Sequence, residues 1–401
     1  MSKILYISYD GILEPLGYSQ VWSYLKELSK NNEIWLLSFE KKKDILDQER
    51  IINMRQDCLD CGIKWKSLDY HKSPTALATG FDIFLGCLVA FMISYRNKIS
   101  IIHVRSYVPA LIGVFVKKLL GTKFIFDMRG LWPDEKVDSG SWKKKGMLYK
   151  IAKFLEKSFF LNADIIVSLT RAGVKEIKSF PYLQSINKEF KVITTCANLK
   201  VFNLPQEKGI EESSLNKPFT LGHVGSVTLW YAFEEALVCY QMLQKIDPSA
   251  RFFILNKGQH DLIQKKLDDL DIDQKNVILI EANQDEVANF MQQMDAGIFF
   301  IKPFYSKISS APTKLGEFLG SGVPCLGNHG IGDMTDILEA NNVGVSIKDF
   351  NRESLQKGLQ EIMQLSKEPD IKRRCRKVAE ENFSLERGVQ SYQQIYNHLD
   401  R

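Results

Sequence analysis

The chain has 401 residues, too many for one ordinary hydrophobic core and enough for two domains of roughly 200 residues. Apolar residues make up 45% and charged residues 25% of the sequence, which excludes a disordered, collagen-like or coiled-coil protein. Residues 1–200 hold 31 Lys and Arg against 20 Asp and Glu, whereas residues 201–401 hold 22 against 28. The asymmetry predicts two domains with different partners, the basic one suited to nucleic acid, an anionic membrane or a phosphorylated ligand.

Three features set expectations for the compartment. The seven cysteines are scattered, which predicts a reduced, cytosolic protein; Cys58 and Cys61 have metal or redox spacing, but no second Cys/His pair follows nearby. The N-terminus runs directly into a strand pattern and lacks the features of a signal peptide. Within the stretch Ala76 to Tyr95, the apolar run Ile83–Ile93 is too short to span a bilayer and predicts a buried helix.

In chain order, the first half alternates short apolar runs with helical patterns such as Gln20–Lys30 and Leu111–Leu120. Six strands are predicted, at Lys3–Ser8, Glu33–Ser38, Ile101–Val104, Lys123–Asp127, Asp164–Leu169 and Lys191–Thr194. Continuous apolar strands that alternate with helices are typical of a doubly wound parallel sheet. We therefore predict a Rossmann-like α/β domain over residues 1–202.

The second half repeats this pattern after a polar segment, residues 203–218, which we expect to be the linker. Six further strands are predicted, at Phe219–Gly225, Arg251–Leu255, Val277–Ile280, Gly297–Ile301, Pro324–Leu326 and Gly344–Ile347. Residues 219–375 should thus form a second Rossmann-like domain. Residues 376–401 are expected to form a C-terminal helix that packs back on the N-terminal domain. Two such α/β domains in tandem, with a ligand cleft between them, are the predicted architecture.

The most informative segment begins near Ser309 and ends at Pro324. The serines supply an N-cap and Pro312 suits the first turn of a helix, which Gly322 and Pro324 would end. A helix start that faces the cleft presents free amides to a diphosphate, and Lys314 adds a positive charge. Glu317, one turn later, can accept hydrogen bonds from a ribose diol. An ordinary capped helix with a surface Lys–Glu pair explains the same spacing equally well.

These residues resemble a known signature. Pro312-Thr313-Lys314 with Glu317, Gly322-Val323-Pro324 and Gly330-Ile331-Gly332-Asp333 look like the donor site of GT-B glycosyltransferases of family 4. Bacterial surface-polysaccharide members of that family are similar at Tyr9-Asp10-Gly11, Leu16-Gly17-Tyr18-Ser19-Gln20, the stretch from Phe126 to Trp132, Gly225-Ser226-Val227 and Trp230-Tyr231. The resemblance extends over essentially the whole chain.

The resemblance implies the GT-B fold and transfer of a sugar from a nucleoside diphosphate to an acceptor hydroxyl, with retention of configuration and without metal or cofactor. The C-terminal domain would hold the donor and the N-terminal domain the acceptor. Without a metal, amides and cations must stabilise the leaving diphosphate. The residues we assign to donor binding are Gly17, Gly225, Ser226, Lys302, Lys307, Ser310, Pro312, Thr313, Lys314 and Glu317.

The sequence departs from the family pattern in two places. Ser309 stands where the family has an earlier glutamate that contacts the donor sugar. The loop after the first C-domain strand lacks the usual Arg and Lys, so Lys302 or Lys307 is a candidate replacement. Gly17 lies in the first strand-to-helix loop, where a glycine lets a ligand approach closely; a simple turn glycine is the alternative.

The N-terminal half contributes four candidate catalytic residues, His103, Arg105, Asp127 and Glu135. His103 and Arg105 share one side of a strand, near the position where the family often has a histidine that touches the donor sugar. A histidine in an apolar strand is also commonly a core residue. Asp127 and Arg129 end the next strand at the ligand-binding edge, with an internal ion pair as the equal alternative. Asp134 and Glu135 follow in a loop that could supply a base, and Glu135 is the residue we select.

Residues 141–160 carry six lysines and one acid, with apolar residues at 147, 148, 151, 154, 155 and 159. Such a basic amphipathic helix suits an anionic membrane surface. The alternative is a helix that packs its apolar face on the sheet and keeps its lysines in water. Nucleic acid is not expected as a partner, because no known binding module is present.

Together these features predict a cytoplasmic retaining glycosyltransferase, peripheral at the membrane, that acts on a lipid-linked or growing glycan of O-antigen or capsule type. Its partners would be a nucleotide-sugar donor, that acceptor and an anionic membrane. One alternative is a nucleotide-sugar epimerase or hydrolase of the same fold. The other is a degenerate, non-catalytic glycan- or nucleotide-binding subunit, which the loss of the first glutamate would suit.

Overall fold

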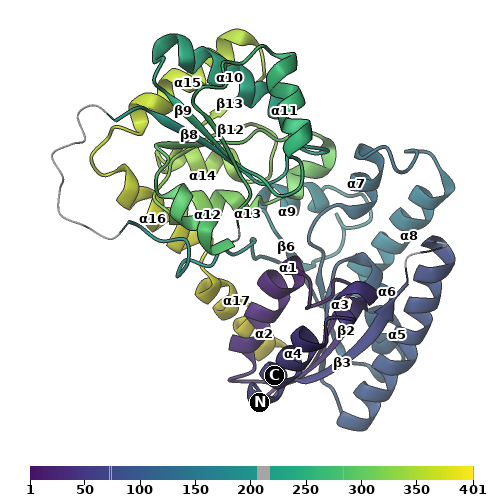
Figure 1. The fold of residues 1–401 in the computed structure, drawn as a ribbon. Coiled ribbons are helices and arrows are strands. Elements are labelled where there is room, and N and C mark those ends of the chain that lie inside the picture. Colours follow the sequence, from purple (N-terminus) through teal and green to yellow (C-terminus); the bar gives the residue numbers. More distant parts are fainter. Residues whose placement is uncertain (72, 74, 206–216, 283, 401) are drawn as a thin grey trace. The chain divides into compact units, whose positions relative to one another are not determined.

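The structure is a computed structural model and describes residues 1–71, 73, 75–205, 217–282 and 284–400. The chain divides into two compact units, each built around its own parallel sheet (Figure 1). Unit 1 comprises Met1–Thr194 and Leu385–Arg401, and unit 2 comprises Thr195–Ser384. Of the predicted linker, residues 206–216 lie outside the described residues.

The chain passes between the two units twice, after Thr194 and after Ser384, and both positions differ from the predicted domain bounds. Residues 195–202, which the sequence assigned to the first domain, belong to unit 2, because Phe202 is buried in that unit's core. The predicted C-terminal helix over residues 376–401 is divided in two. Helix α16 (Ile371–Asn382) belongs to unit 2, and only α17 (Leu385–Leu399) packs back on unit 1.

Seven parallel strands form the sheet of unit 1, in the order β3-β2-β1-β4-β5-β6-β7. They are β1 (Lys3–Ser8), β2 (Glu33–Lys41), β3 (Lys64–Tyr70), β4 (Ile101–Arg105), β5 (Lys123–Asp127), β6 (Ile165–Ser168) and β7 (Glu189–Val192). The strands in the middle of this sheet are buried on both faces, as a parallel sheet covered by helices requires. The sequence prediction missed β3, an edge strand that exposes Lys64, Lys66 and Asp69.

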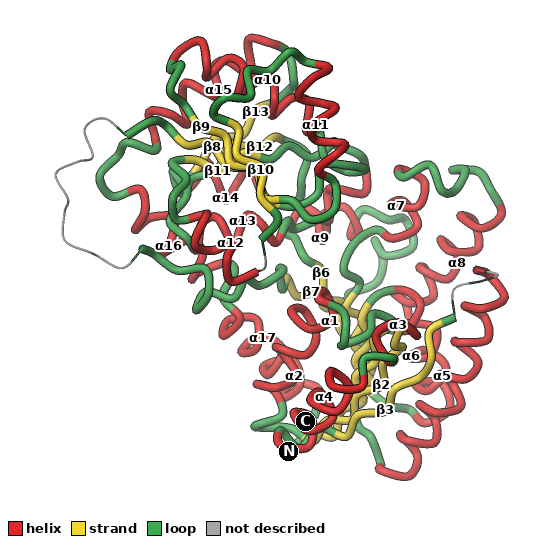
Figure 2. Tube along the Cα trace, viewed as in Figure 1, coloured by secondary structure: helices red, strands yellow, loops and turns green. Residues whose placement is uncertain are grey.

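Helices cover both faces of this sheet. They are α1 (Pro15–Gly17), the π-helical turn η1 (Tyr18–Trp22), α2 (Ser23–Leu28), α3 (Lys42–Ile45), α4 (Gln48–Asp60), α5 (Thr75–Asn97), α6 (Tyr107–Leu120), α7 (Trp132–Asp138), α8 (Met147–Asn162), α9 (Arg171–Lys178) and α17. The chain moves outward from β1 to β3, then returns to β4 and continues to β6. Right-handed crossovers therefore place α2 and α4 on one face and α5, α6 and α8 on the other (Figure 2).

The C-terminal helix α17 is bound to the strands of unit 1. The Tyr392 hydroxyl donates to Asp127 Oδ2 at 2.9 Å, and the Tyr396 hydroxyl lies 2.7 Å from His103 Nδ1. These two contacts join residues that are more than 260 positions apart in the chain. The last helix thus completes the core of the first unit.

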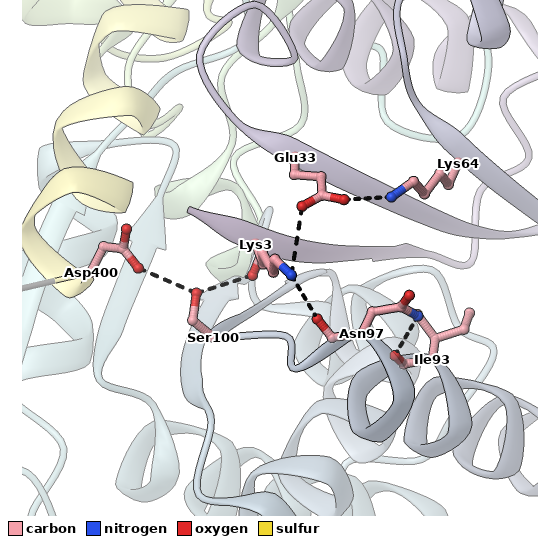
Figure 3. Close-up of polar contacts among 7 residues, drawn as sticks. All are labelled: Lys3, Glu33, Lys64, Ile93, Asn97, Ser100 and Asp400. Atoms are coloured by element: carbon pink, nitrogen blue, oxygen red, sulfur yellow. Dashed lines mark hydrogen bonds and ion pairs between the residues drawn. The ribbon is translucent and has the colours of Figure 1, made fainter. Parts of the chain in front are cut away.

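Figure 3 shows polar contacts at the amino ends of strands β1, β2 and β3 and just before β4. The Ser100 hydroxyl lies 3.3 Å from Asp400 Oδ1 and 3.1 Å from the Lys3 carbonyl. The Lys3 ammonium lies 3.3 Å from the Asn97 carbonyl, at the end of α5, and 3.9 Å from Glu33 Oε2. This network joins β1, β2, α5 and the end of the chain.

Unit 2 contains six parallel strands in the order β10-β9-β8-β11-β12-β13. They are β8 (Thr220–Val224), β9 (Arg251–Leu255), β10 (Val277–Ile280), β11 (Ala296–Ile298), β12 (Cys325–Asn328) and β13 (Gly344–Ile347). The helices are α10 (Phe233–Ile246), α11 (His260–Asp269), α12 (Gln284–Met291), the 3₁₀ turn η3 (Tyr305–Ser309), α13 (Thr313–Gly320), α14 (Met334–Ala340), α15 (Arg352–Leu365) and α16. The predicted fold class, two Rossmann-like α/β units with C-terminal helices, is confirmed.

Candidate functional site

The candidate site in unit 2 lies where the strand order reverses. The chain runs from β8 out to β10 on one side and from β11 out to β13 on the other, so β8 and β11 flank the switch point. Open α/β sheets bind ligands beyond the carboxyl ends of the strands at such a point. Gly225 follows β8, and the segment after β11 leads through η3 to α13. Most of the predicted donor-binding residues lie on these loops.

The start of α13 differs from its predicted capping. Pro312 itself is the N-cap residue, and no side chain caps the helix. The predicted serine cap is therefore wrong: Ser309 and Ser310 lie in and after η3, where the Ser310 amide donates to the Lys307 carbonyl at 3.1 Å. Amide groups in the first turn of an uncapped helix need another acceptor, which an anionic ligand can supply.

Lys314 lies in the first turn of α13 and is buried, with 8% of its surface exposed. Its Nζ has no hydrogen-bond partner among the described residues. It lies 3.9 Å from the ring centroid of Tyr231 and 5.5 Å from that of Phe299. Burial lowers the pKa of Lys314 from 10.5 to about 7, and the nearby Glu317 carboxylate opposes this shift. A buried ammonium that lacks an acceptor marks a place where an anion would be stabilised.

Gly225 lies directly beside this ammonium. Its φ of +93° is a conformation that a side chain would strain, and a Cβ at this position would be 3.4 Å from Lys314 Nζ. The glycine is thus required both by the turn after β8 and by the space in front of Nζ. Lys314, Gly225 and the start of α13 form the centre of the candidate site.

Two amide side chains that the sequence prediction missed hold the loop after Gly225. Asn256 Nδ2 donates to the Gly225 carbonyl at 2.9 Å, and Gln259 Oε1 accepts from the Val227 amide at 3.1 Å. Gln259 Nε2 also donates to Thr228 Oγ1 at 2.9 Å. Asn256 directly follows β9, and this position at the carboxyl edge of the sheet is the sequence feature from which its role could have been predicted. These residues position the loop.

Two aromatic rings contact the buried lysines of the site. Lys307 is buried in η3, with Nζ 3.6 Å from the ring centroid of Trp230, whereas Lys302 is exposed and its amide donates to the Trp230 carbonyl. Tyr231, whose ring contacts the Lys314 ammonium, forms an isolated antiparallel β-bridge with Ile301. Trp230 and Tyr231 are part of the family resemblance, which gave them no role. In the structure, each ring makes a cation–π contact with a lysine of the site.

Three other predicted positions flank this centre. Glu317 lies one turn after Lys314, and burial raises its pKa to about 7, although the Lys314 ammonium opposes the shift. Ser309, in place of the family's first glutamate, is buried, and its hydroxyl donates to the Ser306 carbonyl at 3.3 Å. Ser226 is exposed, and its hydroxyl lies 3.3 Å from Thr228 Oγ1. Thr313 is the first residue of α13.

In unit 1, His103 has the surroundings of a core histidine. It is fully buried in β4, bonded to Tyr396 through Nδ1, and its Nε2 lies 4.0 Å from Asp127 Oδ2. Burial lowers the pKa of His103 to about 4, so the ring is neutral at physiological pH. The contact with α17 leaves His103 no access to a ligand from that side, and its assignment as catalytic is not supported.

Arg105, Asp127 and Arg129 meet at the carboxyl edge of the unit 1 sheet. Asp127 Oδ2 lies 4.0 Å from Arg105 Nη1, and Oδ1 lies 3.8 Å from Arg129 Nη1. Arg105 Nε also lies 3.5 Å from Asp10, which is half-exposed. The predicted alternative of an internal ion pair thus describes Asp127 and the buried Arg105, while Asp10 lies at the surface of this edge.

The remaining two predicted residues lie apart from these contacts. Glu135 is in the first turn of α7, where the more buried carboxylate is Asp134, an acceptor from Tyr149 at 2.8 Å. A Cβ at Gly17 would be 1.9 Å from the Gly11 carbonyl oxygen, so the close approach of two backbone segments explains this glycine. Its φ is −64°, an ordinary helical value.

Within the described ranges, no three His, Cys, Asp or Glu side chains gather as a group that could hold a metal ion. No family model matches the sequence, and no curated protein matches it. Solved structures, by contrast, match over nearly the whole chain at low sequence identity.

Three matches illustrate this. A sucrose-phosphate synthase from Thermosynechococcus elongatus has a TM-score of 0.72 at 11% identity, covering 100% of this chain and 99% of its own. A glycosyltransferase from Rickettsia africae has a TM-score of 0.69 at 14% identity, with coverage of 100% and 99%. Anabaena HepE in complex with UDP has a TM-score of 0.66 at 11% identity, with coverage of 99% and 100%.

A putative UDP-N-acetylglucosamine 2-epimerase from Listeria monocytogenes also matches, with a TM-score of 0.55 at 14% identity over 97% of this chain and 94% of its own. The chain therefore has the GT-B fold, which glycosyltransferases and this epimerase share. At these identities the likeness defines the fold alone.

Proposed function

We propose that the protein is a retaining glycosyltransferase that moves a sugar from a nucleoside diphosphate to an acceptor hydroxyl. The observation that carries the proposal is the buried, unpartnered ammonium of Lys314, beside Gly225 and in the first turn of an uncapped helix. The fold supports it, because Anabaena HepE, a structure of the same fold, is in complex with UDP.

The residues of unit 2 would act on the leaving group. The bond between the anomeric carbon and the diphosphate oxygen breaks, the acceptor oxygen takes its place on the same face, and the acceptor proton passes to the departing diphosphate. Lys314 and the first amides of α13 would stabilise the charge that develops on the diphosphate, so the reaction would need no metal. Glu317 would bind the ribose diol, and Lys307 and Lys302 would add positive charge near the phosphates.

The acceptor and the location belong to the same proposal. Asp10, half-exposed at the carboxyl edge of the unit 1 sheet and paired with the buried Arg105, is suited to a polar glycan acceptor. We place the enzyme in the cytoplasm at the membrane face, held by the basic segment 141–160, with a lipid-linked or growing surface glycan as acceptor. The lysines of that segment support this placement, since Lys143, Lys144 and Lys145 are all exposed.

A second candidate is a nucleotide-sugar epimerase or hydrolase, which the match to the putative epimerase favours. Glu317, with its pKa near 7, is the carboxyl group next to Lys314 that could serve as an acid or base in such a reaction. The third, a non-catalytic subunit, is favoured by Ser309 in place of the sugar-binding glutamate. It predicts binding of a nucleoside diphosphate without turnover.

The experiment that tests the proposal combines binding and turnover. Thermal unfolding is measured with UDP, GDP, CDP, NAD and short RNA, each with and without a chelator. A ligand at a hundred times its Kd contributes about 2.7 kcal/mol, or several degrees in the midpoint. A chelator-insensitive shift with one nucleoside diphosphate supports the transferase, and a shift with NAD or RNA alone contradicts it. Release of nucleotide from the sugar donor only when an acceptor extract is present then separates transferase from epimerase and from inactive subunit.

A further inference from the structure

Helix α5 presents its large apolar side chains to the outside of unit 1. The buried positions recur every fourth residue and hold small or polar residues: Ala78, Asp82, Gly86, Ala90 and Ser94. The outward positions, each 45–75% exposed, are Leu77, Phe81, Phe84, Leu88, Met92 and Tyr95. A helix that packs on a soluble core normally has the reverse distribution. The prediction of a buried helix is thus wrong, because small residues make the contact with the sheet.

The inner face of α5 is packed closely. A Cβ at Gly86 would be 2.5 Å from Ile112 Cδ1 of α6 and 3.0 Å from Phe39 of β2. Asp82, fully buried, accepts from the Tyr9 hydroxyl at 2.8 Å and lies 2.6 Å from His71 Nδ1. These contacts bind α5 to the rest of unit 1 along one side, so the outward apolar face is a fixed part of the surface.

In the described part of the chain, one helix is long and apolar enough to cross a membrane, Leu77–Asn97, and only 28% of its most apolar window is buried. A crossing would require α5 to leave the sheet and to carry the buried Asp82 into lipid without its partners. Its geometry instead suits a helix that lies in the plane of a membrane surface, with one face in protein and the other in lipid.

The neighbouring helices extend the apolar face. Helices α5, α6 and α8 follow one another on the same side of the sheet (Figure 1). Outward residues on α6 and α8, 38–77% exposed, are Phe115, Leu119, Met147, Leu148, Ile151 and Phe154. On α8 the buried positions are Ala152, Glu156, Phe159 and Phe160, so most of the apolar stripe predicted within 141–160 faces outward.

The charge around this apolar face, which we call the α5–α6–α8 face, is positive. The only acids on the three helices are Asp82 and Glu156, both fully buried. The exposed cations on these helices are Arg96, Lys118, Lys150 and Lys157. Two copies of such a face would set cation against cation, which disfavours self-association. Exposed apolar side chains beside cations, without exposed carboxylates, complement anionic lipid.

A groove of about 980 Å³ continues this surface beside α5. Val89, Met92 and Ile93 of α5 line one side, and Trp35 and Trp65 contribute apolar surface from β2 and β3. The cations in its lining are Arg55, Lys64, Lys66 and Arg96. The groove thus adds the same combination of apolar surface and positive charge next to the helix.

We propose that α5 lies along an anionic lipid bilayer with its outward face in the boundary between headgroups and acyl chains, and that α6 and α8 extend this contact. The proposal concerns unit 1 alone and goes beyond the basic segment 141–160, because it assigns the main apolar insertion to α5, which lies outside that segment. Membrane attachment then has two components, a salt-resistant one from α5 and a salt-sensitive one from the lysines.

The test is flotation of the purified full chain with vesicles of phosphatidylcholine alone or of phosphatidylcholine with roughly one-third phosphatidylglycerol, an anionic lipid that gives the surface a negative potential. We expect binding to the anionic vesicles, part of which survives 0.5 M salt, a concentration at which the Debye length is about 4–5 Å. The variant Phe84→Ser with Leu88→Ser should lose the salt-resistant part, by about tenfold or more in partition coefficient. Its matched control is Ile52→Ser with Ile246→Ser, two apolar residues on α4 and α10 that are at least as exposed as Phe84 and Leu88, respectively.

Folding of each variant is checked by the thermal midpoint and by the nucleotide-induced shift, which reports on unit 2. If the α5 variant binds vesicles as the control does, the proposal is overturned. It is also overturned if wild-type protein forms dimers that this variant dissolves, or if neutral and anionic vesicles bind equally. A vesicle-dependent protection of α5 amides from hydrogen exchange, absent from α4, would support it. If no nucleoside diphosphate raises the thermal midpoint of the wild-type protein, the proposed function is contradicted. The vesicle result is independent of that outcome.

Discussion

Gly225 and Lys314 lie against each other in unit 2, so that a Cβ at position 225 would be 3.4 Å from the lysine Nζ. The two residues are almost ninety positions apart and belong to different elements, the turn after β8 and the first turn of α13. Gly225 therefore leaves one side of the ammonium free of a side chain, whereas the Tyr231 ring covers another side. The combination of an open backbone and a desolvated cation is suited to a phosphate group.

Replacement of Gly225 by Ala tests this relationship. The positive φ should cost about 1–2 kcal/mol of stability, and the added methyl group should weaken UDP binding by about tenfold. Gly258→Ala is the matched control, because Gly258 has a φ of +79° and nothing within 4 Å of its Cβ position. Both variants should lose thermal stability, and only Gly225→Ala should lose affinity in calorimetric titration. Equal affinities would remove Gly225 from the site.

Replacement of Lys314 by Met should separate stability from binding. Met keeps the apolar stem against Tyr231 and Phe299 but removes an ammonium that lacks a partner, so the free protein should unfold at a higher temperature. Loss of a charged contact of about 1.5–3 kcal/mol should weaken UDP binding by roughly 10- to 100-fold. Lys245→Met, at an exposed lysine of α10, should change neither quantity. Unchanged UDP binding by Lys314→Met contradicts the proposed site.

The shifted pKa of Lys314 predicts how stability depends on pH. Between about 7, its folded value, and 10.5, the unfolded chain holds a proton that the folded protein has lost. The free energy of unfolding of the free protein should therefore rise with pH over this window, by at most about 1.4 kcal/mol per unit. Glu317 acts oppositely below pH 7: its folded pKa is raised from 4.5 to about 7, so its contribution falls as pH rises between those values. Urea titrations from pH 5 to 10 on wild type and Lys314→Met measure the slopes, and an upper slope common to both would contradict the assignment.

The affinity for nucleotide should depend on the protonation of Lys314. A diphosphate favours the charged ammonium, so UDP binding above pH 7 should take up a proton and weaken as the pH rises. Calorimetry in two buffers of different ionisation enthalpy measures the proton uptake directly. In Lys314→Met the uptake should vanish. Uptake that persists in this variant would assign the proton to another group.

The contact between His103 and Tyr396 should be structural. Tyr396→Phe removes the hydroxyl at 2.7 Å from a buried ring nitrogen, which should cost about 1–3 kcal/mol of stability. Because both residues lie in unit 1, the UDP-induced shift should be unchanged. Tyr24→Phe, at another buried tyrosine near α17, serves as the comparison. A turnover defect larger than the loss of folded protein would restore a catalytic role for this histidine.

The basic segment before α8 should govern the salt-sensitive part of membrane binding. Charge reversal of Lys143, Lys144 and Lys145 to Glu should weaken binding to anionic vesicles by roughly 100-fold, at about 1 kcal/mol per lysine. The same reversal at three exposed lysines of unit 2, Lys257, Lys265 and Lys275, is the control. Equal cosedimentation of the two triple variants would exclude segment 141–160 from the membrane contact.

Much of the fold could be predicted because its signals are local. A strand buried on both faces needs a continuous apolar run, as at Lys3–Ser8, and the sequence located a strand near every observed one except β3. For the partly exposed edge strand β7 (Glu189–Val192), the predicted bounds, Lys191–Thr194, overlap only its last two residues. Strand β3 forms the edge of its sheet, where one side faces water and alternating lysines replace the run. The helix that begins at Thr313 was also predictable, since Pro312 and Gly322 mark its two ends.

The outward face of α5 and the partners of the buried polar groups were decided only by the tertiary structure. Composition showed that α5 is apolar, but which of its faces packs depends on the small residues that fit against Ile112 and Phe39. Likewise, the role of His103 depends on Tyr396, which the chain brings to it from 293 positions away. Periodicity along a sequence records how much of an element is apolar. What that element contacts is set by which distant segments pack against it, and this is a property of the folded chain alone.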